Sequence, residues 1–193
     1  SGAVYGKLNQ TLDKVSETNL CSVNPALVNN TYGISKIQAE NLCALYSHNY
    51  GLDYVVARCF AFVGQFLPLD SYFAIGNFIN HVSKNEDVIL TGDGSAVRSY
   101  LDANDLSEWL WTLLFKGKKA GVYNVGSDQE ITILELANLV RDVIDSSQSK
   151  VIVQNNVQVA NDYYVPNIDK IKEELGVCQT ISLEQSIKQV LQK

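Results

Sequence analysis

Short apolar runs alternate along this chain with longer stretches in which apolar side chains recur at helical spacing. The β-rich runs, each expected to form a strand, lie at residues 54–60, 88–90, 121–126 and 151–153. The first of these is apolar except at Arg58, which is typical of a buried parallel strand. Helical spacing predicts helices at residues 32–48, 73–82, 104–114, 132–144, 168–175 and 183–191.

Individual residues mark the faces and ends of these elements. Apolar positions of the first helix are Ile34, Ile37, Ala39, Leu42, Leu45 and Tyr46, and those of the second are Phe78, Ile79 and Val82. Residues 29–31 and Asn104 suit helix N-caps, and Thr132 with Glu135 has capping-box spacing. Asp93-Gly94 predicts a turn, most simply a plain hairpin. Residues 1–6 are expected to end a strand, and residues 7–30 and 162–166 to form loops.

Composition narrows the classes of protein that fit. The chain has 193 residues, of which 46% are hydrophobic, so a core can form in one or two small domains. A net charge of −6 argues against a nucleic-acid partner, for which a basic face is expected. No apolar run approaches the roughly 18 residues of a membrane helix, and no signal-peptide pattern is present. We therefore expect neither a nucleic-acid nor a membrane partner.

The cysteines and histidines do not predict a metal site. The chain has four cysteines, Cys21, Cys43, Cys59 and Cys178, without metal-ligand spacing, and two histidines, His48 and His81. The simplest interpretation is buried or inert thiols in a reducing cytoplasm.

Residues 32–36, Tyr-Gly-Ile-Ser-Lys, carry the chemistry that the sequence suggests most directly. Residues four apart lie on one face of a helix, about 5–6 Å apart at Cβ. A free tyrosine, with a pKa near ~10, is a poor base at neutral pH. A neighbouring ammonium and the positive end of a helix both lower the pKa of a tyrosine. The spacing of Tyr32 and Lys36 therefore suits a tyrosine that takes a proton from an alcohol, although a plain surface tyrosine beside a solvated lysine has the same spacing.

A series of motifs in fixed order places this pair in context. It runs through Ser1-Gly2-Ala3-Val4-Tyr5-Gly6, Tyr32-Gly33-Ile34-Ser35-Lys36, Arg58-Cys59-Phe60-Ala61-Phe62-Val63-Gly64, Gly92-Asp93-Gly94, Arg98-Ser99-Tyr100-Leu101, Asp105-Leu106, Tyr164-Val165-Pro166 and Leu175-Gly176. The series resembles the extended short-chain dehydrogenase/reductases. More narrowly, it is similar to the NAD-dependent epimerase/dehydratase family, which works on nucleotide sugars.

The resemblance implies an α/β fold. It comprises the C-terminal portion of a Rossmann-type doubly wound sheet plus a smaller α/β substrate-binding domain. Residues 1–64 would be the remnant of the NAD-binding domain, and residues 65–193 mainly the nucleotide-sugar domain, with segments near 99–126 returning to the Rossmann sheet. The chain lacks methionine, even at position 1, and contains no Gly-x-Gly-x-x-Gly. We therefore expect it to be a fragment whose N-terminal dinucleotide-binding half is absent.

The resemblance also implies roles for individual residues. Ser1, Tyr32 and Lys36 would be catalytic, and Tyr32, Lys36 and the backbone near Phe60 would contact NAD, with NADP as the other possibility. Leu90, Thr91 and Arg98 would bind the nucleotide-diphosphate sugar, because an arginine fork can engage two phosphate oxygens. The full-length protein would be a cytoplasmic homodimer.

The sequence departs from the family pattern at several positions. In 4,6-dehydratases the residue matching Ser1 is followed by Asp and Glu, the acid and base of water elimination; here these are Gly2 and Ala3. The usual asparagine and proline near the end of strand 54–60 are Ala61 and Gln65, and residues 162–164 lack the basic residue often found there. These departures argue against dehydration and leave the sugar open.

Three functions fit these observations. The first is an NAD-dependent epimerase, or related 4-keto chemistry, with Tyr32 as base and Lys36 orienting the cofactor. The second is an NADP-dependent nucleotide-sugar reductase, and the third is a non-catalytic dinucleotide-binding relative. Retention of Ser1, Tyr32 and Lys36 together favours an enzyme.

Overall fold

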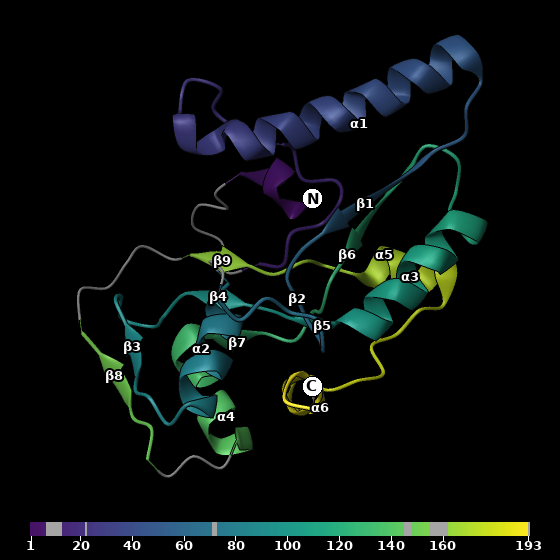
Figure 1. Ribbon diagram of the computed structural model, residues 1–193. Coiled ribbons are helices and arrows are strands. Elements are labelled where there is room, and N and C mark those ends of the chain that lie inside the picture. Colours follow the sequence, from purple (N-terminus) through teal and green to yellow (C-terminus); the bar gives the residue numbers. More distant parts are fainter. Residues whose placement is uncertain (7–12, 22, 71–72, 145–147, 155–161, 193) are drawn as a thin grey trace.

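The computed structural model describes residues 1–6, 13–21, 23–70, 73–144, 148–154 and 162–192. Helices and short, mostly parallel strands alternate within them (Figure 1). The helices are η1 (Gly2–Tyr5) and η2 (Val28–Asn30), which are 3-10 helices, and α1 (Thr31–Tyr50), α2 (Ala74–Ser83), α3 (Ala103–Lys116), α4 (Ile133–Ile144), α5 (Asp169–Leu175) and α6 (Leu183–Val190). The strands are β1 (Val55–Cys59), β2 (Phe62–Val63), β3 (Val88–Leu90), β4 (Val97–Arg98), β5 (Leu101–Asp102), β6 (Gly121–Val125), β7 (Ile131–Thr132), β8 (Val151–Val153) and β9 (Tyr163–Tyr164).

The strands pair in four small sheets. Parallel pairs join β1 to β6, β2 to β5 and β3 to β8. In the fourth sheet the central β4 runs antiparallel to β7 and parallel to β9. Segment 99–126 thus returns a strand to β1, while the two-domain division proposed from the sequence stays a prediction.

Two helical layers bury most of the apolar side chains. Helix α2 packs on α4, and α4 on α6, in the lower part of Figure 1. Their core consists of Val63, Ile75, Phe78, Ile79, Val82, Val88, Leu90, Tyr100, Leu136, Ala137, Val140, Ile187 and Val190, which confirms the predicted core positions of the second helix. A second core lies among β1, β6, α3 and α5, with Leu101, Trp109, Leu113, Tyr123, Val125, Ile168, Ile171 and Val177 buried.

Helix α1 differs from the other helices. It exists as predicted and ends two residues beyond His48, but Gly33 is its only buried residue. The expected apolar face is not buried, because Leu42, Leu45 and Tyr46 are about half exposed. Strand β1 shows a related difference: its parallel pairing is confirmed, but only Arg58 of its five residues is buried. Among the described residues β1 pairs on one side only.

Helix caps and turns agree with the sequence predictions at some positions and differ at others. The capping box is confirmed, since Thr132 N donates to Glu135 Oε2 (2.8 Å) and Glu135 N donates to Thr132 Oγ1 (3.1 Å). Gly94 has the expected positive φ of 77°. The hairpin is wrong, because β3 and β4 lie in different sheets. The strand end at residues 1–6 is also wrong: η1 forms there, since the Ser1 hydroxyl caps it by accepting from Ala3 N.

The predicted cap of α3 needs correction, and most of the thiols are exposed rather than buried. Asp102, not Asn104, is the N-cap of α3, because its Oδ1 accepts from Asn104 N (2.7 Å). Of the four free cysteines, Cys59 is half-buried and the other three are exposed. Part of the predicted loop 7–30 lies outside the described residues. In the described part of this loop, Val15 forms an isolated parallel β-bridge with Pro166.

Candidate functional site

The first turns of α1 bring the predicted Tyr32 and Lys36 together. Lys36 Nζ lies 5.2 Å from the centroid of the Tyr32 ring, and Tyr32 is 60% exposed. Asn30 occupies the N-cap position without a side-chain cap bond. In the part of the chain that the structure describes, Lys36 forms no ion pair. Its ammonium can therefore donate to a ligand bound beside the tyrosine.

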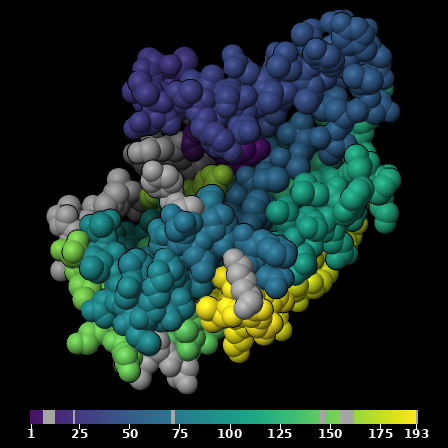
Figure 2. Space-filling model, viewed as in Figure 1, coloured from purple at the N-terminus to yellow at the C-terminus, as the bar shows by residue number. Residues whose placement is uncertain are grey.

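Gly33 sets how closely this helix approaches the N-terminal segment. A Cβ at Gly33 would lie only 2.7 Å from the Ala3 carbonyl oxygen. The missing side chain thus lets α1 lie against η1, next to the cap residue Ser1 (Figure 1). In Figure 2 the surface is hollowed beneath α1, and purple atoms of the N-terminal segment are visible in that hollow. The three predicted catalytic residues come from these two adjoining elements.

Sequence reasoning missed a buried network that fastens α1 to the sheet. Arg58 on β1 donates two hydrogen bonds to the Glu40 carboxylate on α1, from Nε to Oε1 (3.0 Å) and from Nη2 to Oε2 (2.8 Å). Arg58 Nη1 also donates to Tyr5 Oη (2.9 Å), which in turn donates to Asn124 Oδ1 on β6 (2.8 Å). Arg58 and Tyr5 stand in the motif series, but the spacing of neither residue carries a signal for these partners.

Arg58 keeps its positive charge in this buried network. Burial alone would lower the pKa of the guanidinium, but hydrogen bonds with Glu40 and Tyr5 outweigh it and raise the pKa above its ordinary value. Arg58 is therefore a permanent cation whose carboxylate partner lies one turn of α1 beyond Lys36.

An aromatic cluster lies below η1. The ring centroid of Phe60 is 4.7 Å from that of Tyr164 on β9 and 6.3 Å from that of Tyr5. The Phe60 amide N–H donates to the Val125 carbonyl (2.9 Å), so it is already used in the sheet. A nicotinamide contact by the backbone at this residue would have to use another group, and it stays a prediction.

Arg98 lies on β4, directly beside β9. Its register partner is Tyr164, and its Nη2 lies 2.5 Å from Asp162 Oδ2. Nη1 donates to the carbonyl oxygens of Val97 and Asp162 (2.9 Å each). The guanidinium is thus held in place at the edge of β9. Its binding of a diphosphate stays a prediction.

A cavity of about 350 Å³ opens next to this ion pair. It contains Leu90 and Thr91, the residues predicted to border the nucleotide, together with Asp162 from the Arg98 pair. Its other lining residues are Ala74, Asn77, Phe78, Ile89, Gly92, Asp93, Gly94, Ser95, Ala96 and Ile133. The structure therefore gathers the three predicted substrate-binding residues around one cavity and its edge.

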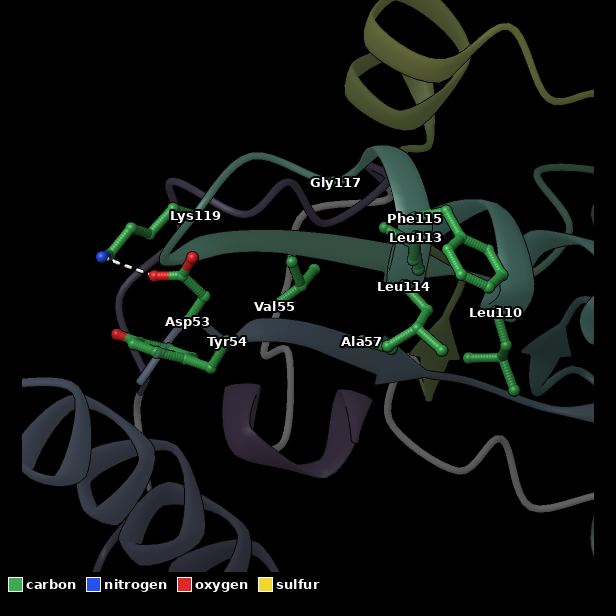
Figure 3. Close-up of a pocket in the computed structure, with 10 residues that line it drawn as sticks. All are labelled: Asp53, Tyr54, Val55, Ala57, Leu110, Leu113, Leu114, Phe115, Gly117 and Lys119. Carbon is green, nitrogen blue, oxygen red and sulfur yellow. Dashed lines mark ion pairs between the residues drawn. The ribbon is translucent and has the colours of Figure 1, made fainter. Parts of the chain in front are cut away.

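A second cavity, of about 400 Å³, has different surroundings (Figure 3). Leucines and Phe115 of α3 line one part of it, and the Lys119–Asp53 ion pair stands at the other end. None of the predicted site residues lines this cavity. It lies along β1 and α3 rather than around the site described above.

The described residues contain neither a metal-binding cluster nor a helix that could span a membrane. No group of three or more His, Cys, Asp and Glu side chains is arranged to hold a metal ion. No described helix is both long and apolar enough to cross a membrane.

Residues 1–126 match the model of a protein family described as the NAD dependent epimerase/dehydratase family. The chain belongs to this family. Among curated relatives, UDP-glucuronic acid decarboxylase 4 of Arabidopsis thaliana is 32% identical over 171 residues, which are 89% of this chain and 38% of that protein. The dTDP-glucose 4,6-dehydratase of Xanthomonas campestris is 27% identical over 97% of this chain and 54% of its own length. The chain thus spans roughly 38–54% of the length of these two family members.

Solved structures confirm the α/β Rossmann-like fold with parallel strands. UDP-glucose 4-epimerase from Thermotoga maritima superposes with a TM-score of 0.85 at 24% identity, over 99% of this chain and 60% of that one. RMD from Pseudomonas aeruginosa, complexed with NADPH, gives a TM-score of 0.83 at 24% identity, over 100% of this chain and 63% of that one. At these identities the likeness concerns the fold.

The family's cofactor, NAD, fits part of what the chain offers. The Lys36 ammonium, which has no ion-pair partner among the described residues, lies beside Tyr32 and suits the hydroxyls of a nicotinamide ribose. The pyrophosphate usually binds to backbone amides at a glycine-rich helix start. The chain has no Gly-x-Gly-x-x-Gly sequence, so these residues fit the nicotinamide end of the cofactor only.

Proposed function

We propose that the protein carrying this chain modifies a nucleotide-diphosphate sugar with Tyr32 as the proton acceptor. The observation that carries the proposal is the continuity of the site. Tyr32 and Lys36 lie against η1, and β9 below η1 pairs with β4, which carries Arg98. The Asp162 partner of Arg98 lines the 350 Å³ cavity. A substrate with its nucleotide in that cavity and its diphosphate at Arg98 would direct its sugar toward Tyr32.

Each residue then has a distinct task. Tyr32 accepts the proton of a sugar hydroxyl and returns it when the carbonyl is reduced again. Lys36 holds the ribose of the cofactor and so orients it beside Tyr32. The Ser1 hydroxyl, which accepts from Ala3 N, retains its own proton to donate to the reacting oxygen. NAD, when bound, supplies the hydride acceptor and donor.

Epimerisation through a 4-keto sugar is the reaction we favour. Gly2 and Ala3, which follow Ser1, have no group that transfers a proton, so elimination of water by neighbouring side chains is disfavoured. A second candidate is decarboxylation of UDP-glucuronic acid, favoured by 32% identity to enzymes of that name. An NADP-dependent reductase and a non-catalytic relative remain the alternatives.

A homodimer joined through α1 belongs to the same proposal, since α1 exposes apolar residues. Light scattering of the full-length protein tests this dimer.

The test is Tyr32→Phe in the full-length protein. The ring packing stays and only the proton acceptor is lost, so turnover should fall by about 10²–10⁴ while substrate binding is retained. Tyr46→Phe is the matched control, because it removes an exposed hydroxyl from the same helix. Mass spectrometry of products from UDP-glucose, UDP-glucuronic acid and dTDP-glucose separates epimerisation, loss of carbon dioxide and loss of water. A Tyr32→Phe protein with most of its kcat would contradict the assignment.

A further inference from the structure

The ion pair between Arg98 and Asp162 stands where the proposed substrate would place its diphosphate. Arg98 Nη2 lies 2.5 Å from Asp162 Oδ2, and the side chains are 24% and 54% exposed. Asp162 also lines the cavity of about 350 Å³ that would bind the nucleotide. A carboxylate of the chain therefore already holds the guanidinium that an anionic ligand in this cavity would reach.

The remaining bonds of Arg98 are made with the backbone. Nη1 donates to the carbonyl oxygens of Val97 and Asp162 (2.9 Å each), and Val97 N donates to the same Asp162 carbonyl (2.9 Å). These bonds keep the guanidinium in place when the carboxylate leaves it. The Asp162 carboxylate forms no other bond among the described residues, and its side chain is more than half exposed. It is thus the exchangeable partner of Arg98, and a phosphate oxygen can replace it.

The cavity beside this pair carries negative rather than positive charge. Its described lining residues include two carboxylates, Asp93 and Asp162, and neither a lysine nor an arginine. The charge of Arg98 at the edge is balanced by its own partner. Each additional negative charge on a ligand is therefore opposed by these carboxylates, at distances over which salt screens the repulsion only in part.

Ligands of the proposed site differ in the charge of their terminal phosphate. In a nucleotide sugar this phosphate is esterified by the sugar and carries a single negative charge. In a free nucleoside diphosphate it has no ester, and such a phosphate carries a charge of about −1.5 to −2 at pH 7. The displaced Asp162 carboxylate stays near this phosphate, because the Asp162 backbone remains bonded to Arg98 Nη1. It therefore repels the free nucleoside diphosphate more strongly than the nucleotide sugar.

We propose that Asp162 is a specificity-determining residue that lets the site favour a nucleotide sugar over the free nucleoside diphosphate. Its carboxylate holds the place on Arg98 that the phosphate takes, and it repels a second charge on that phosphate. The inference rests on the proposed function and adds to it the residue that selects the esterified form of the diphosphate. A free nucleoside diphosphate, which has the same base and ribose, then competes poorly for the cavity.

The experiment compares the full-length protein with its Asp162→Asn variant, which keeps the shape of the side chain and removes its charge. Calorimetry with UDP-glucose and dTDP-glucose, each against UDP or dTDP, gives the affinities. The variant should bind the preferred nucleotide sugar about twofold to fivefold more tightly, because an exposed ion pair no longer has to be broken. It should bind the free nucleoside diphosphate about fivefold to fifteenfold more tightly, because the second charge is no longer repelled.

A third ligand separates the charge of the phosphate from contacts of the sugar. The methyl ester of the preferred nucleoside diphosphate, on its terminal phosphate, has the charge of a nucleotide sugar but no sugar ring. It should respond to Asp162→Asn as the nucleotide sugar does. Asp142→Asn is the matched control, because Asp142 is an exposed, ion-paired aspartate near the opposite end of α4 from the cavity residue Ile133. It should leave all three affinities unchanged.

The outcomes separate this inference from the function on which it rests. If wild type binds a nucleotide sugar and Asp162→Asn leaves the ratio of the affinities for sugar and nucleoside diphosphate unchanged, the inference is overturned while the proposed function stands. Weaker binding of the nucleotide sugar by Asp162→Asn also overturns it, because the carboxylate would then assist the ligand. A methyl ester that responds as the free nucleoside diphosphate does would show that charge is not selected. Failure of wild type to bind any nucleotide sugar overturns both.

Discussion

Helices α4 and α1 are held to the body of this protein in different ways. Three residues of α4, Leu136, Ala137 and Val140, are completely buried, and α2 packs against them with four large apolar side chains. In α1 the only buried residue is Gly33, and four large apolar residues of its second half are about half exposed or more: Leu42, Leu45, Tyr46 and Tyr50. The α2–α4 layer is thus held by hydrophobic burial. Helix α1 is attached by a close backbone approach and by the Arg58–Glu40 pair.

The two regions would have different roles in the proposed site, one in nucleotide binding and the other in proton transfer. The cavity that would bind the nucleotide is bordered by α2 and by the turn after β3, in the well-packed region. The proposed proton acceptor lies on the helix with few buried contacts. Since the free energy of local opening rises with buried apolar contact, we expect binding to depend on a rigid region and catalysis on the polar attachment of α1.

The largest expected effect is on the free energy of unfolding. Ile79→Ala in α2 removes a fully buried side chain and should cost about 2–5 kcal/mol. Leu42→Ala in α1, where the leucine is 52% exposed, should change the stability of the chain by only about 0.5 kcal/mol. Urea denaturation of both variants measures the difference. Similar losses in the free energy of unfolding would contradict the difference between α2 and α1, and would mean that another surface covers α1 in solution.

A variant of Arg98 tests whether the edge of the nucleotide cavity binds the diphosphate. Arg98→Ala should weaken binding of UDP or dTDP by roughly tenfold or more, because a charge-assisted contact is worth about 1.5–3 kcal/mol. Arg141→Ala is the control, since Arg141 forms a comparable ion pair with Asp142 on α4. Equal affinities of the two variants, measured by calorimetry, would contradict a role for Arg98 in binding the diphosphate.

The smallest expected effect concerns the attachment of α1. Glu40→Gln keeps the shape of the side chain but removes the charge that faces Arg58. Hydrogen exchange should show the amides of α1 opening more easily by about 1 kcal/mol, with those of α4 unchanged. Glu108→Gln on α3, an exposed glutamate without an ion pair among the described residues, should leave α1 unaffected. Equal protection of α1 in both variants would contradict a role for the pair.

Local patterns in the sequence were sufficient for much of this structure. The Tyr32–Lys36 spacing gave one helical face, and the capping box of Thr132 and Glu135 formed as predicted. The predicted apolar positions Phe78, Ile79 and Val82 are among the core positions of α2. In each case the information lies within a few residues of chain, where helical geometry is fixed.

Contacts between distant segments could not be obtained in this way. The Tyr164 hydroxyl lies where a side chain of Gly2 would begin, yet neither position has a local signal for the other. The Arg58–Glu40 pair likewise depends on how β1 passes beneath α1. The apolar positions of α1 follow from helical spacing, which identifies a face but does not supply the partner that would cover it.

Gly33 has a consequence for attempts to engineer this protein. Methods that stabilise helices favour alanine over an interior glycine, an exchange usually worth about 1 kcal/mol. At this position the added methyl group would meet the backbone of Ala3, which cannot move aside as a flexible side chain can. A redesign guided by helix propensity alone would therefore stiffen α1 while moving Tyr32 and Lys36 away from Ser1. The resulting protein would gain heat resistance in that helix and lose alignment of its reacting groups.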